Sequence, residues 1–147
     1  MMAIRKFALI YGIVFLVIGI AGFIPAFVTP YNPADPNLAV TAGAGYLFGI
    51  FPVNLLHNLT HAAFGIWGIV AYGSLSGSRL YAQAVAIIYG VFVIMGLIPG
   101  LMTVFGLVPL HGNDVWLHVI LAAVAGYFGY FARADTAAPE SREQVSK

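Results

Sequence analysis

Two pairs of polar side chains, each embedded in an apolar segment, are the residues of this sequence best suited to chemistry. His57 and His61 form the first pair, and Asp114 and His118 form the second. The members of each pair are four residues apart, so on a helix they lie on one face. Ionisable groups inside membrane helices are costly and tend to face the protein interior, so the two pairs predict a functional site.

The sequence leaves several interpretations of this site open. Three imidazoles and a carboxylate, from His57, His61, Asp114 and His118, suit zinc or another divalent first-row metal. Alternatively, His61 and His118 are axial ligands of a tetrapyrrole such as haem or chlorophyll. A third interpretation is a proton or ion relay, because histidine titrates near neutral pH. We favour a fourth, a structural network in which polar side chains hold the helices together.

Further polar residues accompany the two pairs and are expected to join this network: Asn54, Asn58, His111 and Asn113. No familiar catalytic motif accompanies them. The sequence lacks a Gly-x-Ser-x-Gly elbow, a phosphate-binding glycine loop and a His-Glu-x-x-His pattern. The absence of cysteine excludes disulfides and thiolate ligands. We therefore expect a protein that is not an enzyme.

The composition predicts an integral membrane protein. Of the 147 residues, 61% are hydrophobic and 7% are charged, against about 25% charged in a soluble domain. One bilayer crossing takes roughly 20 apolar residues, and the apolar segments predict an all-α, four-helix transmembrane bundle. Its spans are expected at about 7–28, 53–72, 80–104 and 113–131, within a membrane domain of residues 1–132 followed by a polar tail, 133–147. The segment 29–44 is predicted to be an irregular outer loop, and 45–51 an interfacial segment.

The positive charges predict the orientation of these spans. With four crossings, every lysine and arginine falls on one side of the membrane: Arg5, Lys6, Arg79, Arg133, Arg142 and Lys147. Positive residues stay cytoplasmic, so both termini are expected in the cytoplasm, in a bacterial inner or thylakoid-type membrane. The His/Asp pocket then faces outward. No cluster of basic residues suggests nucleic-acid binding; the expected partners are the lipid bilayer and other membrane proteins or further copies of this chain.

Two similarities within the chain predict an internal repeat. Phe48-Gly49-Ile50-Phe51-Pro52 precedes the first polar pair, and Phe105-Gly106-Leu107-Val108-Pro109 precedes the second at the same spacing. Ala8-Leu9-Ile10-Tyr11-Gly12 resembles Ala86-Ile87-Ile88-Tyr89-Gly90. Spans one and two thus repeat as spans three and four. This arrangement predicts two parallel helical hairpins related by a pseudo-twofold axis along the membrane normal.

The sequence also resembles a known family. The segment Asn54-Leu55-Leu56-His57-Asn58-Leu59-Thr60-His61 carries the resemblance most specifically, with Arg5-Lys6-Phe7-Ala8, Leu47-Phe48-Gly49, Asn113-Asp114 and Leu117-His118 beside it. Together they are similar to small bacterial membrane proteins classed as the domain of unknown function DUF4383, over about Arg5 to Phe131. The resemblance implies a four-helix membrane fold and supplies no activity or ligand. We expect an accessory or structural subunit; the alternative is a metal- or tetrapyrrole-binding protein.

Overall fold

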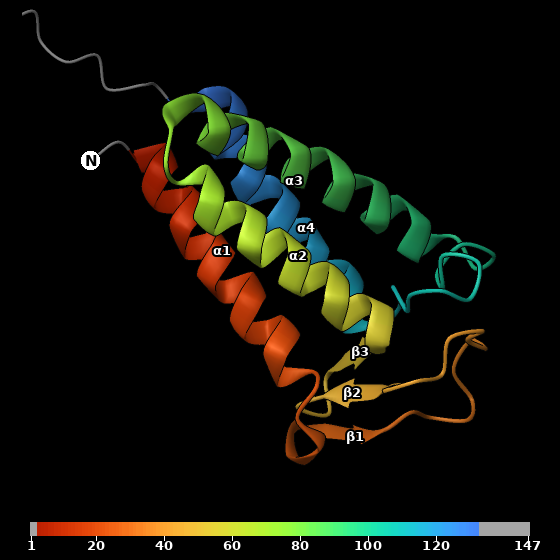
Figure 1. Cartoon of the computed structure of the whole chain (residues 1–147). Coiled ribbons are helices and arrows are strands. Elements are labelled where there is room, and N and C mark those ends of the chain that lie inside the picture. Colours follow the sequence, from red (N-terminus) through yellow and green to blue (C-terminus); the bar gives the residue numbers. More distant parts are fainter. Residues whose placement is uncertain (1–2, 133–147) are drawn as a thin grey trace, which may run out of the picture.

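The computed structural model describes residues 3–132, and four helices that run alternately in opposite directions make up most of it (Figure 1). They are α1 (Ala3–Ala21), α2 (Leu55–Ala71), α3 (Leu75–Leu97) and α4 (Asn113–Gly126), which a π-helical turn, η2 (Tyr127–Phe131), continues. Helices α1 and α2 form one hairpin, and α3 and α4 form the other. The start of α1 and the end of α4 lie at the same end of the molecule. The expectation of a mostly helical protein is confirmed; the predicted tail, 133–147, lies outside the described residues.

Prolines and caps set several helix bounds, and α1 and α3 each begin earlier and end earlier than the predicted spans 7–28 and 80–104. Helix α1 ends at Ala21 rather than near residue 28, and a short 3₁₀ turn, η1 (Pro25–Phe27), follows it. Helix α3 begins at Leu75 because the Ser74 side chain accepts a hydrogen bond from the Gly77 N–H. It ends at Leu97 rather than near 104, two residues before Pro99, since a residue preceding proline avoids the helical region.

A three-stranded antiparallel sheet closes the end of the bundle where α1 ends and α2 begins (Figure 1). Its strands are β1 (Val28–Pro30), β2 (Gly45–Leu47) and β3 (Phe51–Val53), in the order β1-β2-β3. The sequence analysis expected an irregular loop and an interfacial segment here, so the sheet corrects the purely α-helical expectation. Strands of three residues are too short to leave a readable alternation of apolar and polar side chains.

The repeated Phe-Gly dipeptide forms the same kind of turn in both copies. Phe48 and Gly49 have φ values of 52° and 70°, and Phe105 and Gly106 have values of 58° and 88°. The carbonyl before each dipeptide accepts a hydrogen bond from the N–H after it, at 3.0 Å and 3.2 Å respectively. Positive φ is uncommon for a residue other than glycine. The first turn joins β2 to β3, and the second lies in the α3–α4 loop.

Small residues let α1 and α2 approach closely. A Cβ atom on Gly65 of α2 would lie only 2.5 Å from the backbone N of Leu16 on α1. A Cβ atom on Gly12 of α1 would lie 2.6 Å from the backbone N of Ile69 on α2. Such contact of backbones is typical of glycine-mediated packing between membrane helices.

Aromatic side chains fill the space between the two hairpins. Phe15 of α1 and Tyr89 of α3 are buried and stack with their ring centroids 5.3 Å apart. Large apolar side chains also face outward from every helix, such as Val17, Ile66, Ile94 and Ile120. Three helical segments, Ala3–Ala21, Leu75–Leu97 and Asn113–Phe131, are long and apolar enough to cross a membrane, and α2 is a shorter apolar helix. The molecule therefore has the features of a membrane protein.

We predict that Gly65→Ala lowers the free energy of unfolding by about 1–3 kcal/mol, because the added methyl group must push α1 away from α2. Gly90→Ala is the matched control, since a Cβ atom there meets no other atom within 4 Å. It should change stability by less than about 1 kcal/mol. Unfolding in detergent, followed by circular dichroism, measures both variants. Equal stability of the two would contradict this packing.

Candidate functional site

Asn54 fixes the start of α2, the helix that carries the first polar pair. Its side-chain oxygen accepts a hydrogen bond from the backbone N–H of His57 at 2.9 Å. Its side-chain nitrogen donates to the carbonyls of Val40 at 2.9 Å and Leu107 at 2.7 Å. A fully buried cap thus ties the start of α2 to the β1–β2 loop and to the α3–α4 loop. All three bonds use an amide, which can accept and donate at once.

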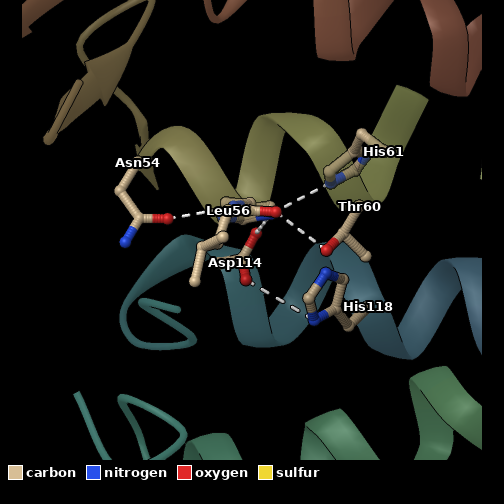
Figure 2. A network of polar contacts seen from close by, with 7 residues as sticks. Asn54, Leu56, Thr60, His61, Asp114 and His118 are labelled. Atoms are coloured by element: carbon tan, nitrogen blue, oxygen red, sulfur yellow. Dashed lines mark hydrogen bonds and ion pairs between the residues drawn. The ribbon is translucent and has the colours of Figure 1, made fainter. Parts of the chain in front are cut away.

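The structure brings the four predicted residues together in a buried cluster. His57 and His61 stack one turn apart on α2, with their Nε2 atoms 2.9 Å apart. Figure 2 shows Asp114 and His118 reaching this pair from α4. The carboxylate of Asp114 lies 4.0 Å from His57 Nε2 and 3.5 Å from His118 Nδ1. All four side chains are buried.

The three imidazoles are close enough to share one metal ion. One ring nitrogen from each of His57, His61 and His118 can be chosen so that all lie within 4.8 Å of one another. Bonds of about 2.0–2.1 Å in a tetrahedral site place such nitrogens about 3.3 Å apart. To bind one ion, the rings would have to rotate so that the longest distance between these nitrogens shortens by at most about 1.5 Å. A cavity of about 50 Å³ adjoins the three rings, which is enough for an ion or a water molecule.

Several polar atoms of this cluster have no hydrogen-bond partner. They are His57 Nδ1, His61 Nδ1, Asp114 Oδ2, and both ring nitrogens of His118. Buried polar groups in folded proteins are nearly always paired, because desolvation without a partner is costly. A purely structural network would satisfy these atoms within the protein. Their arrangement instead fits a set of donors that a ligand completes.

Aromatic rings occupy the space beside the imidazoles. Phe15 makes an edge contact with His61, with ring centroids 5.3 Å apart, and Tyr89 makes the same contact with His118 at 4.7 Å. Because Phe15 and Tyr89 also stack on each other, they fill the position that a flat macrocycle between the two histidines would need. The geometry therefore favours a compact ion over a tetrapyrrole.

The other predicted polar residues lie around the cluster rather than in it. Asn58 is buried on the side of α2 that faces α1, where it contacts Gly22. Asn113 is exposed, and its side chain lies 3.5 Å from the Ile50 carbonyl. His111 lies in the loop before α4, where its Nε2 shares a hydrogen bond of 2.8 Å with Tyr31 Oη.

His111 belongs to a second polar network that the sequence did not reveal. Tyr31 and Tyr46 stack with centroids 5.8 Å apart, and the hydroxyl of Tyr46 donates to Asp35 Oδ2. Burial and the nearby Asp35 charge raise the pKa of Tyr31 to about 12, and burial lowers the pKa of His111. Nothing in the spacing of these residues links position 31 to position 111, so only the folded structure could join them.

Comparisons with known proteins agree with the resemblance found in the sequence. A family model described as a domain of unknown function (DUF4383) matches residues 5–131. This range contains the whole His/Asp cluster and all four helices except the first two residues of α1. No curated protein and no solved structure matches the chain.

We predict that Asn54→Ala lowers the free energy of unfolding by about 2–4 kcal/mol, because α2 loses its cap and two partly buried hydrogen bonds to carbonyls lose their donor. Asn113→Ala is the control, since this exposed amide makes only one long contact; its effect should stay within about 0.5 kcal/mol. Denaturant unfolding of both variants provides the comparison. If the Asn54 variant were as stable as the Asn113 variant, the cap would not hold the loops together.

Proposed function

Because the chain belongs to the DUF4383 family, whose description assigns no activity, we propose a function from the site itself: a membrane protein that binds one divalent transition-metal ion, zinc or a similar metal. His57, His61 and His118 are its ligands. The observation that carries the proposal is three buried imidazoles, from two helices, with ring nitrogens within 4.8 Å of one another. Imidazole ligands suit zinc, copper, iron or nickel better than magnesium or calcium.

Asp114 has a distinct role in this proposal. Its Oδ2 lies 3.5 Å from Nδ1 of His118. A carboxylate that accepts from Nδ1–H fixes the orientation of the ring and leaves Nε2 free for the ion. With Asp114 in this role the ion has three protein ligands and an open fourth position. Open positions are typical of metal sites that bind an exogenous molecule, whereas structural sites are closed by four protein ligands.

The other functions expected from the sequence have less support. The accessory-subunit role and the ion relay stay predictions, since no described contact bears on either. The tetrapyrrole alternative conflicts with the aromatic packing of Phe15 and Tyr89 on the two histidines. The two ring nitrogens of His118 that lack a hydrogen-bond partner favour metal binding over a structural network, whereas the contact between His57 Nε2 and His61 Nε2 is one that such a network would also make.

We predict that the protein, purified in mild detergent and dialysed against Co²⁺, binds about one ion per chain. A Co²⁺ site with three imidazoles should show visible absorption bands typical of low coordination number. His61→Ala and His118→Ala should abolish them. His111→Ala is the matched control, because this histidine bonds Tyr31 outside the cluster, and it should leave binding unchanged.

Elemental analysis of the same samples gives the stoichiometry. Asp114→Asn should keep the ion but weaken its binding about 10- to 100-fold, as expected for a residue that orients a ligand. Wild-type protein that takes up no metal, or loss of binding in His111→Ala alone, would refute the metal site.

We also propose that all four helices cross the bilayer, with both termini in the cytoplasm of a bacterial inner or thylakoid-type membrane. Helix α2 has 17 residues, about 25 Å at 1.5 Å per residue, which is near the lower limit for a span. The positions of the described cations support a cytoplasmic location for the end of the bundle where α1 and α3 begin. Arg5 donates to the Tyr72 carbonyl at 2.8 Å, and Arg79 donates to the Ala132 carbonyl at 3.2 Å.

Contacts that recur in the two hairpins support the proposed duplication. Arg5 and Arg79 each begin one hairpin and bond a carbonyl at its far end. Phe15 contacts His61 as Tyr89 contacts His118. Likewise, a Cβ atom on Gly22 would meet Asn58, and one on Gly96 would meet Val115. In these contacts, each residue of the first hairpin's leading segment corresponds to one 74 residues later in the chain. The sequence similarity had instead matched Tyr11 with Tyr89, a correspondence that differs by four residues, or about one helical turn.

We predict that cysteine labelling distinguishes the two ends of the bundle, since the natural sequence contains no cysteine. Asn37 lies in the loop between β1 and β2, and Ser76 lies at the start of α3; both are exposed. In intact cells a membrane-impermeant maleimide should label Asn37→Cys but not Ser76→Cys, and after lysis it should label both. The reverse pattern in intact cells would invert the proposed orientation.

A further inference from the structure

A second cavity lies against the His/Asp cluster, on the side of α1. Its volume is about 230 Å³, and α1, the β2–β3 hairpin and α4 form its walls. Apolar side chains such as Phe15, Ile18 and Leu121 line nearly all of it. The polar exceptions are His57, His61 and Asp114, whose side chains lie close to one another. A largely apolar cavity with a few convergent polar groups is the usual form of a small-molecule site.

The rim of this cavity faces the expected lipid rather than water. Val14 of α1 and Phe48 of the β2–β3 turn both line it, and they are 47% and 51% exposed. Val14 lies in the middle of a helix long and apolar enough to cross a membrane. A molecule that enters past Val14 therefore comes from the bilayer, and its larger part must be apolar.

The net charge of the proposed metal site determines which chemical group the bound molecule must present to it. A divalent ion with three neutral imidazoles and an ionised Asp114 carries a net charge of +1. A buried net charge is costly in an apolar interior, so an anionic fourth ligand is favoured. The cations within the described chain, Arg5, Lys6 and Arg79, lie at the opposite end of the bundle and do not compete for this anion.

The volume limits how much of the molecule fits inside. At about 30 Å³ per water-sized group, 230 Å³ holds roughly eight such groups. This corresponds to the head half of a single extended hydrocarbon chain. Sugars and peptides are excluded, because the walls offer them few hydrogen-bond partners.

We propose that this cavity binds a fatty acid from the bilayer, with its carboxylate on the open position of the metal and its chain along the apolar walls. The inference rests on the proposed metal site and names the class of molecule that the site receives. In this exchange the bond between the metal and a water molecule would break, a bond between the metal and a carboxylate oxygen would form, and no covalent bond within the fatty acid would change.

The test uses Co²⁺-loaded protein in phosphatidylcholine nanodiscs, titrated with dodecanoate. The visible Co²⁺ bands should change in a saturable way at about one dodecanoate per chain. Methyl dodecanoate has the same chain without the charge and should bind at least 10-fold more weakly. Equal responses to the acid and the ester would overturn the carboxylate–metal contact.

Two tryptophan variants test the place of binding. Val14→Trp puts a large side chain at the rim and should weaken dodecanoate binding at least 10-fold while cobalt stoichiometry stays near one. Val17→Trp is the matched control, because Val17 lies on the same helix, is 57% exposed and does not line the cavity. Dodecanoate binding that both variants retain would overturn the cavity assignment.

The titration also separates the two proposals. Wild-type protein that binds cobalt but does not respond to dodecanoate overturns the fatty-acid inference and leaves the metal site standing. Wild-type protein that binds no cobalt overturns the metal site, and the inference that rests on it falls as well.

Discussion

The burial of ionisable side chains is the constraint on which the rest of this structure depends. His57, His61, Asp114 and His118 meet in a largely apolar interior, where a polar group without a partner costs several kcal/mol. The surrounding fold holds them at fixed positions. Asn54 sets the start of α2, and aromatic rings fill the space beside two of the imidazoles. In the proposed metal site, this fixed arrangement would hold three imidazoles ready for an ion before the ion binds.

On the proposed duplication, the two hairpins supply equivalent but not identical parts. Each contributes one histidine that contacts an aromatic ring, His61 with Phe15 and His118 with Tyr89. The hairpins differ one turn earlier, where the first has His57 and the second has Asp114. This difference gives three imidazoles and one carboxylate instead of a symmetric set. In the proposed metal site, this carboxylate would orient a ligand histidine and leave one position on the ion without a protein ligand.

A sheet and two joined loops cover the end of the bundle where α2 begins. The sheet β1–β3 covers the end of the bundle (Figure 1), and Asn54 draws the β1–β2 loop and the α3–α4 loop together. Tyr31 bonds His111 across the same two loops. These contacts tie the β1–β2 loop and the α3–α4 loop together near the start of α2. The apolar cavity beside the cluster has exposed apolar residues in its lining, and the proposed fatty acid would therefore enter it from the side of the bundle.

The sequence by itself determined the helical membrane architecture, the family and the residues of the cluster. Hydrophobicity locates the helices, because a helix that crosses a membrane needs a long run of apolar residues. A spacing of four residues puts His57 beside His61, and Asp114 beside His118, on one helix face. Only the tertiary structure decided the rest. It ended α1 at Ala21, formed a sheet from strands too short to show a period, and joined Tyr31 to His111. It also brought side chains of α2 and α4 together in the interior so that the two pairs meet, and left an apolar cavity beside them. Contacts between distant segments follow from how side chains fill shared space, and that information is absent from the local pattern of residues.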